Sequence, residues 1–237
     1  MNNIDYLKKY YSGNIDDAIK RLENGEPLQY IVGNQDFYGY ILNVDKRVLI
    51  PRRETEELVE EVIKRSNNFT ELKIVDIGTG SGAIAIALSK ELKTKVIATD
   101  ISNDAIEVAK ENIKKNNADI KLLQGDMLEP LIKNNIKVNI LVSNPPYIKE
   151  NENIEKIVYD NEPHLALFAK EEGIEFYKKI LKNCSKVLED KFLIAFEIGE
   201  TQGNVVRELA HNYLKNIKVE IKKDLSEKER MVFVYNY

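Results

Sequence analysis

The tetrapeptide Asn144-Pro145-Pro146-Tyr147 follows directly on the apolar run 139–143. No sheet continues through two prolines, so a buried strand is expected to end here. The Asn144 side-chain oxygen and the carbonyls around Pro145, which has no N–H, are hydrogen-bond acceptors. Two or three convergent acceptors suit a substrate NH₂ group, and the Tyr147 ring can lie against a planar amide or base. The alternative is a Pro-Pro turn with an incidental asparagine, and the tetrapeptide alone leaves both open.

A glycine-rich turn between an expected strand and an expected helix is the second candidate. It begins at Asp76 and contains Gly78, Thr79, Gly80, Ser81 and Gly82. Glycines permit a tight turn and let a ligand approach the N-terminus of the following helix closely. Such a turn alone is weak evidence for a ligand site, so the residues that follow the neighbouring strands must be considered with it.

Two further acids follow the next two expected strands. Asp100 is placed where an acid binds ribose hydroxyls in nucleotide-binding α/β folds. Asp126 is placed to receive an adenine amine, with Met127 against the ring. Taken singly, each acid could cap a helix or brace a turn. Acids at three successive strand ends, on one rim of a sheet, indicate a shared site.

The charge of Asp76 bears on which nucleotide would bind. This acid would repel the pyrophosphate of a dinucleotide, whereas the amino group and sulfonium of S-adenosylmethionine are cations. The sequence therefore favours S-adenosylmethionine as cofactor, with S-adenosylhomocysteine as its product, and no metal is expected.

Composition narrows the class of protein. The 237 residues are 43% hydrophobic and 31% charged, which is typical of a globular protein, and the length suits one α/β domain with room for a small appendage. No apolar run approaches the ~20 residues of a membrane span, so no membrane partner is expected. The net charge of −4 argues against affinity that depends on neutralising many phosphates, so direct nucleic-acid binding is not expected. The lone Cys184 is expected to be buried, in a reducing cytoplasm.

The elements that must position these residues follow from hydrophobic periodicity. Residues 1–24 predict one or two short helices, residues 28–50 a hairpin or two short strands, and residues 51–67 a helix. From residue 72 to 143 strands and helices alternate, which predicts parallel strands with right-handed crossovers. Residues 148–164 are polar and predict a loop over Asn144. Helices are expected at 174–188 and 205–214, with a strand at 192–197 between them. Strands at 217–221 and 231–235 must pair antiparallel.

At the level of whole motifs, the chain resembles the class I S-adenosylmethionine-dependent methyltransferases that modify planar NH₂ groups, and more narrowly the PrmC/HemK family. The resemblance runs from Pro27 to the end of the chain. It includes residues 27–33, 37–39, 49–56, 76–82, Asp100, Asp126, 144–147, 162–163, 166–168, 197–199 and 224–226.

The resemblance implies a Rossmann-like fold with a seven-stranded, mostly parallel sheet and an antiparallel terminal strand. It implies three parts: a helical segment 1–26, a β-hairpin linker 27–50 and a methyltransferase domain 51–237. The implied activity is methylation of the glutamine amide in the Gly-Gly-Gln motif of class I peptide release factors. Residues 144–147 would then be catalytic. Asn144 would also join Asp76, residues 78–82, Asp100, Asp126 and Met127 at the cofactor.

Three departures from the family pattern stand out. The family usually has several N-terminal helices, whereas only residues 1–26 precede the match, so a different docking of the release factor is expected. Ala169-Lys170 and Glu227 stand where relatives often have glycines. Two alternatives remain: a nucleic-acid methyltransferase acting on the adenine amine, or a docking module that binds the cofactor without catalysis.

Overall fold

Seven strands form the central sheet in the computed structural model, which describes residues 2–237. Their order is β10-β11-β9-β6-β3-β4-β5. The bounds are β3 Ile74–Ile77, β4 Val96–Asp100, β5 Ile120–Gln124, β6 Val138–Ser143, β9 Leu188–Glu197, β10 Lys218–Lys223 and β11 Glu229–Tyr235. β3 to β6 and β9 run parallel, whereas β11 runs antiparallel to both β9 and β10. The predicted parallel sheet and its antiparallel C-terminal hairpin are confirmed.

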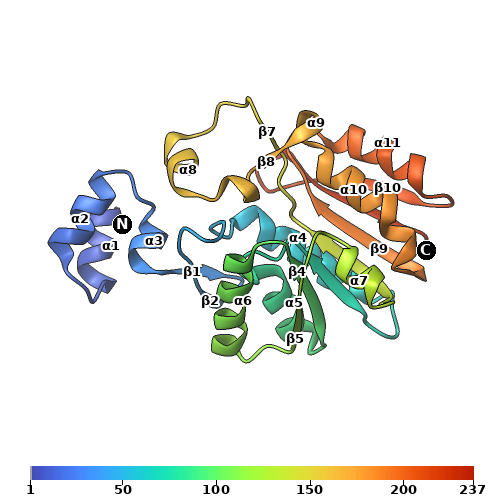
Figure 1. Ribbon diagram of the computed structural model, residues 1–237, viewed down its shortest axis with the longest axis horizontal. Helices are drawn as coiled ribbons and strands as arrows, with labels where there is room; N and C mark the ends of the chain where they lie inside the picture. Colours follow the sequence, from blue (N-terminus) through green and yellow to red (C-terminus); the bar gives the residue numbers. More distant parts are fainter. Residues whose placement is uncertain (1) are drawn as a thin grey trace.

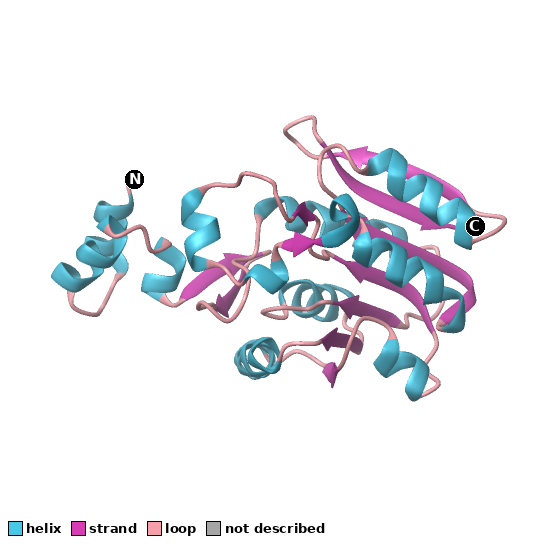
Figure 2. Ribbon diagram, turned by 45° about the horizontal axis from the view of Figure 1, so that its top comes forward, coloured by secondary structure: helices cyan, strands magenta, loops and turns pink. Residues whose placement is uncertain are grey.

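The central strands are covered on both faces, which fits their mostly apolar sequences. Every residue of β3 and β6 is buried. Strands buried on both sides need no polar alternation, because neither face meets water. Figure 2 shows helices on both sides of the twisted sheet.

Each face of the sheet has its own hydrophobic core. One core packs α4 (Arg53–Ser66) and α5 (Ala83–Leu92) against Ile74, Ile140 and Leu193. The other packs α7 (Glu129–Lys133), α10 (Glu175–Asn183) and α11 (Gly203–Tyr213) against the opposite face. α6 (Asn103–Asn116) covers β4 and β5. Cys184 is fully buried in the second core, as expected.

The segment 28–50 is only partly β-structured. Asn34–Phe37 (β1) and Tyr40–Asn43 (β2) form the predicted antiparallel hairpin. Leu28–Val32, however, is a short helix, α3, so the β interpretation of this stretch was wrong. Pro27 precedes its first turn, and Gly33 ends it in the left-handed conformation. A five-residue apolar run has too little periodicity to separate helix from strand.

The structure differs from the predictions at three other places. The expected loop 148–164 contains the two-residue strand β7 (Ile148–Lys149), which pairs with β8 (Phe168–Ala169), and the helix α8 (Lys156–Asn161). α7 was not predicted, because five residues are too few for a helical period. The helix expected over 174–188 ends at Asn183, and Leu188 already belongs to β9. The short helices η1 (His164–Ala166), α9 (Lys170–Gly173) and η2 (Cys184–Lys186) complete the chain.

The N-terminal helices have a small core of their own. α1 (Asn3–Tyr10) and α2 (Ile15–Glu23) pack Leu7 and Ala18 against Ile31 of α3. They lie at one end of the molecule, beyond the hairpin and away from the C-terminal strands (Figure 1). Within residues 2–237, no helix is both long and apolar enough to cross a lipid bilayer.

Replacing Phe196 with alanine is expected to lower the free energy of unfolding by about 3–5 kcal/mol. Phe196 is 0% exposed and packs edge-on against Tyr177, with the ring centroids 5.4 Å apart. Urea denaturation measures the change. The control is Leu225→Ala, because Leu225 is 90% exposed and its truncation is expected to cost less than about 0.5 kcal/mol. Equal losses in the two variants would contradict the assigned core.

Candidate functional site

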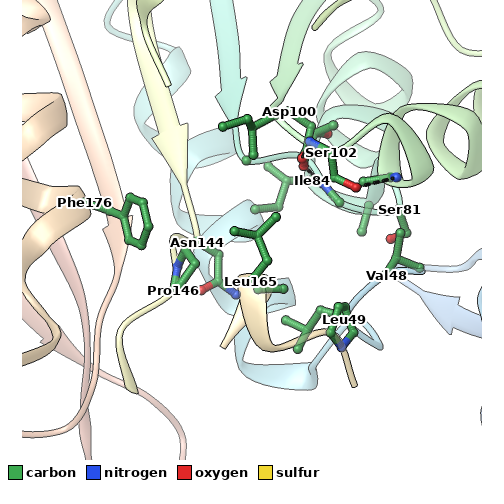
Figure 3. A pocket seen from close by; sticks show the side chains of 18 of the residues that line it. Val48, Leu49, Ser81, Ile84, Asp100, Ser102, Asn144, Pro146, Leu165 and Phe176 are labelled. Atoms are coloured by element: carbon green, nitrogen blue, oxygen red, sulfur yellow. Dashed lines mark hydrogen bonds between the residues drawn. The ribbon is translucent and has the colours of Figure 1, made fainter. Parts of the chain in front are cut away.

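A cavity of about 300 Å³ opens at the carboxyl ends of β3 to β6. This is the edge where ligands bind in open α/β sheets. Figure 3 shows Asp100 and Ser102 on one side of the cavity, Asn144, Pro146 and Phe176 on another, and Val48 and Leu49 on a third. The residues named from the sequence that line it are Gly78, Thr79, Gly80, Ser81, Asp100, Asp126, Met127, Asn144 and Pro146.

The glycine-rich turn forms the floor of this cavity. Gly78 and Gly80 have φ angles of +72° and +55°, a region that L-residues rarely adopt. A Cβ at either position would meet no atom within 4 Å, so both project toward open space. Gly82 differs, because a Cβ there would lie 3.4 Å from Ile86 and 3.6 Å from Ala109. Gly82 therefore serves the packing of α5 against α6, and the first two glycines leave room for a ligand.

Asp100 is held rigidly at the rim. Its Oδ2 accepts a hydrogen bond from Gly80 N at 2.9 Å, and its Oδ1 accepts one from Ser102 N at 2.9 Å. Burial raises the pKa of Asp100, while these N–H groups act in the opposite direction. The carboxylate is an acceptor with lone pairs beyond those two bonds. It is therefore placed to accept hydrogen bonds from hydroxyl groups of a bound ligand.

Asp126 and Met127 form the wall after β5. Asp126 makes an ion pair with Lys179 of α10, a partner that sequence reasoning did not find. Met127 adopts φ +48° and is 9% exposed. The Lys179 pair leaves Asp126 with further lone pairs. Asp126 thus faces the cavity with part of its hydrogen-bonding capacity already used.

Asp76 does not line the cavity. Its carboxylate is fully buried behind the glycine turn, where Thr79 Oγ1 donates to Asp76 Oδ2 at 2.6 Å. Burial raises its pKa to about 7. The other oxygen, Oδ1, has no hydrogen-bond partner among the described residues, so the pairing with a ligand cation that the sequence suggested stays a prediction. Asp76 also braces the turn, since its Oδ2 holds the Thr79 side chain.

A second cavity, of about 380 Å³, adjoins the first. Pro145 and Tyr147 line it, together with Glu197 and residues of the segment 148–167. Four residues line both cavities: Leu49, Arg52, Asn144 and Ala166. Of these four, Asn144 is the one that the tetrapeptide supplies. A group bound in either cavity can therefore reach the Asn144 side chain.

The backbone of the tetrapeptide is fixed by α11 and the β9–α11 loop. Gln202 Nε2 donates to Tyr147 O at 2.9 Å, and Gln202 Oε1 accepts from Gly199 N at 2.9 Å. A Cβ at Gly173 would lie 2.3 Å from Tyr147 O, so the α9–α10 connection also approaches closely. Tyr147 is held by contacts from two separate segments, and it lines the second cavity.

Two buried acids near the junction were not assigned roles from the sequence. Glu197 Oε2 accepts from Thr55 Oγ1 at 2.6 Å, and Thr55 Oγ1 accepts from Asn144 Nδ2 at 3.2 Å. Glu162 Oε1 pairs with Arg52 at 2.5 Å, and its Oε2 accepts from Ile50 N at 3.1 Å.

Both acids lie in stretches already quoted for the family resemblance. Their partners, however, are more than 100 residues away in the chain, and no spacing rule finds such pairs.

Relatives with assigned functions match most of the chain. A release factor glutamine methyltransferase from Streptococcus pneumoniae is 45% identical over 93% of this chain and 78% of that protein. One from Bacillus subtilis is 43% identical over 89% of this chain and 75% of that protein. Residues 54–166 also match the model of the methyltransferase small domain.

Solved structures show the same fold. A release-factor-specific protein-(glutamine-N5) methyltransferase from Alicyclobacillus acidocaldarius aligns with a TM-score of 0.53 at 25% identity, covering 79% of this chain and 94% of that one. A methyltransferase from Pyrococcus furiosus aligns with a TM-score of 0.61 at 17% identity, covering 93% and 98%. At that identity the second match shows the fold alone.

Proposed function

Since the chain belongs to the release factor glutamine methyltransferase family, we propose that it methylates the glutamine side-chain amide in the Gly-Gly-Gln motif of class I peptide release factors. The methyl donor would be S-adenosylmethionine. The observation that supports this most is the junction of two cavities at Asn144. One cavity would hold the donor and the other the glutamine side chain.

The donor cavity offers hydrogen-bonding groups and open backbone that suit S-adenosylmethionine. Asp100 would accept from the ribose hydroxyls, and the open space at Gly78 and Gly80 would admit the ligand close to the backbone. Asp126 and Met127 would border the adenine. When bound, the donor supplies an electrophilic methyl group. Residues 2–237 contain no cluster of His, Cys, Asp and Glu suited to a metal ion, and the proposal assigns no role to one.

The acceptor cavity fits a planar amide. We assign the Asn144 side-chain oxygen and the Pro145 carbonyl as acceptors for the two amide hydrogens. An amide nitrogen is a poor nucleophile, because its lone pair is delocalised into the carbonyl. Holding both hydrogens orients the nitrogen toward the donor cavity and increases its electron density. The chain's contributions are then proximity and electrostatic preorganisation. The nitrogen gains the methyl group and loses one proton, and no residue is assigned as its base.

The partner of this reaction is a protein, and the product of the donor is S-adenosylhomocysteine. Release factors act in translation termination, so the encounter would take place in the cytoplasm. The Gly-Gly-Gln segment would enter the second cavity past Ile154 and Val158, which lie on the segment between β7 and η1.

A methyl-transfer assay with labelled donor tests the proposal against its two alternatives. The acceptors are a release factor, the same factor with the motif glutamine replaced, and duplex DNA. We expect label in the first alone. Label in the DNA would favour an adenine methyltransferase, and label in none, with donor bound, would favour a docking module. Either result would overturn the proposal.

Replacing Asp100 with alanine is expected to weaken donor binding by about 1–3 kcal/mol, the usual range for a lost hydrogen bond to a charged group. Isothermal titration calorimetry with S-adenosylhomocysteine measures the change. Asp104→Ala is the matched control, because Asp104 is an exposed acid four residues away that does not line the cavity. Equal affinity in wild type and Asp100→Ala would remove the assignment.

A further inference from the structure

The Asn144 side chain can act as an acceptor only in one of its two amide orientations. An asparagine carries a carbonyl oxygen on one side and an NH₂ group on the other. If the NH₂ group faced the acceptor cavity, it would meet the NH₂ group of the substrate, and neither could accept. Other groups of the protein must therefore hold the Asn144 oxygen toward the acceptor cavity.

The donors and acceptors behind Asn144 fix the orientation of its amide. Glu197 lies fully buried, and its ionised carboxylate only accepts hydrogen bonds. The Thr55 hydroxyl therefore donates its single hydrogen to Glu197, at 2.6 Å. Its remaining lone pairs then accept from Asn144 Nδ2, at 3.2 Å. With Nδ2 committed to Thr55, Oδ1 is left to face the junction of the cavities.

We propose that Glu197 and Thr55 are positioning residues that fix the Asn144 amide with its oxygen toward the substrate. The inference rests on the proposed function and adds to it the two residues on which acceptor orientation depends. Neither reacts with the substrate. The ionised carboxylate sets the direction of the Thr55 hydroxyl, and the hydroxyl sets the direction of the amide.

Protonation of Glu197 would remove this constraint. A protonated carboxyl can donate to Thr55, which frees the hydroxyl hydrogen for Asn144 Oδ1 and allows the amide to turn over. Burial raises the pKa of Glu197 to about 7, while the hydrogen bond from Thr55 and the charge of Arg230 lower it. The ionised form of Glu197, which is the active one, therefore predominates above pH 7, and turnover falls as the pH drops below 7.

Four other ionisable groups interact with Glu197: Tyr147, Tyr177, Arg230 and Glu54. Burial raises the pKa of Tyr147 and of Tyr177, so both rings stay neutral. The pKa of Arg230 is raised as well, with burial opposed by Tyr147 and Asp224, so it stays charged. Glu54 is the remaining neighbour and adds like charge. Asp76, behind the glycine turn, also has a pKa of about 7, and the test must separate the two.

The test compares four variants in methyl transfer to a release factor, with kcat measured from pH 5.5 to 8.5. Thr55→Val keeps the shape and removes the hydroxyl, and its kcat is expected to fall roughly 10- to 100-fold. Thr55→Ser keeps the hydroxyl and is expected to restore most of the turnover. Glu197→Gln is expected to lower kcat and to abolish the loss of turnover below pH 7. Asp76→Asn is expected to leave that loss in place. Donor affinity is expected to change little in Glu197→Gln, and it is measured for the Thr55 variants as well because Thr55 lines the donor cavity.

The matched control is Glu200→Gln, which makes the same chemical change at an exposed position of the β9–α11 loop. Wild-type turnover and pH profile are expected for it. Wild-type kcat in both Thr55→Val and Glu197→Gln would overturn the inference while leaving the methyltransferase function intact. So would a fall in Thr55→Ser equal to that in Thr55→Val. An inactive wild-type enzyme would instead overturn the proposed function itself.

Discussion

Replacing Asn144 with alanine is expected to lower kcat for methyl transfer by about 10²–10³-fold, the usual cost of removing one preorganised polar contact at a reacting group. The side-chain oxygen is one of two assigned acceptors for the amide hydrogens, and alanine leaves the nitrogen free to rotate. Asn144 lines both cavities, yet the donor retains its contacts with the glycine turn and Asp100. The Kd for S-adenosylhomocysteine is therefore expected to stay within a few-fold of wild type.

Single-turnover kinetics and calorimetry together check this expectation. Asn204→Ala is the control, because Asn204 is exposed on α11 and bonds only to Arg207 there. Near-normal turnover in Asn144→Ala would refute its role in the reaction. A large loss of donor affinity with unchanged kcat would assign Asn144 to the donor rather than to the acceptor.

Replacing Gly80 with valine is expected to weaken donor binding by at least about 100-fold, since the new side chain would fill part of a cavity of about 300 Å³. The Gly80 φ of +55° also disfavours a β-branched residue. Two effects are therefore combined, a strained backbone and an obstructed cavity. Calorimetry measures donor affinity, and thermal unfolding measures the strain.

A second glycine separates these two effects. Gly25, in the turn between α2 and α3, has φ +86° and open space where a Cβ would lie. Gly25→Val is expected to lose comparable stability and to keep wild-type donor affinity. Equal donor affinity in Gly80→Val and wild type would show that the donor does not approach this turn.

The sheet and the rim of the site could be predicted because they depend on local patterns. Strands buried on both faces read as apolar runs, and the residues after Ile77, Asp100 and Ser143 lie on one edge because parallel strands end together. The tight turn at Gly78 to Gly82 was likewise expected, because glycine permits the positive φ angles found there. Such features need only the order of residues along a strand or turn.

The details that could not be predicted depend on contacts between distant segments. Lys179 comes from α10 to pair with Asp126, and Thr55 comes from α4 to meet Glu197. Asp76 was expected to face a ligand; its Oδ2 accepts a hydrogen bond from Thr79, and the expected pairing with a ligand stays a prediction. Strand alternation predicts the face of the sheet on which a side chain lies. Whether that side chain can contact a bound ligand depends on how the following turn folds, which alternation does not predict.

The most direct measurement is a crystal structure of the protein with S-adenosylhomocysteine and a release factor carrying the Gly-Gly-Gln motif. The proposed function predicts the product sulfur in the first cavity and the glutamine amide nitrogen at the Asn144 junction. The amide nitrogen should lie within hydrogen-bond distance of Asn144 Oδ1 and Pro145 O. A glutamine bound outside the second cavity, or separated from the sulfur by the Asn144 side chain, would contradict it.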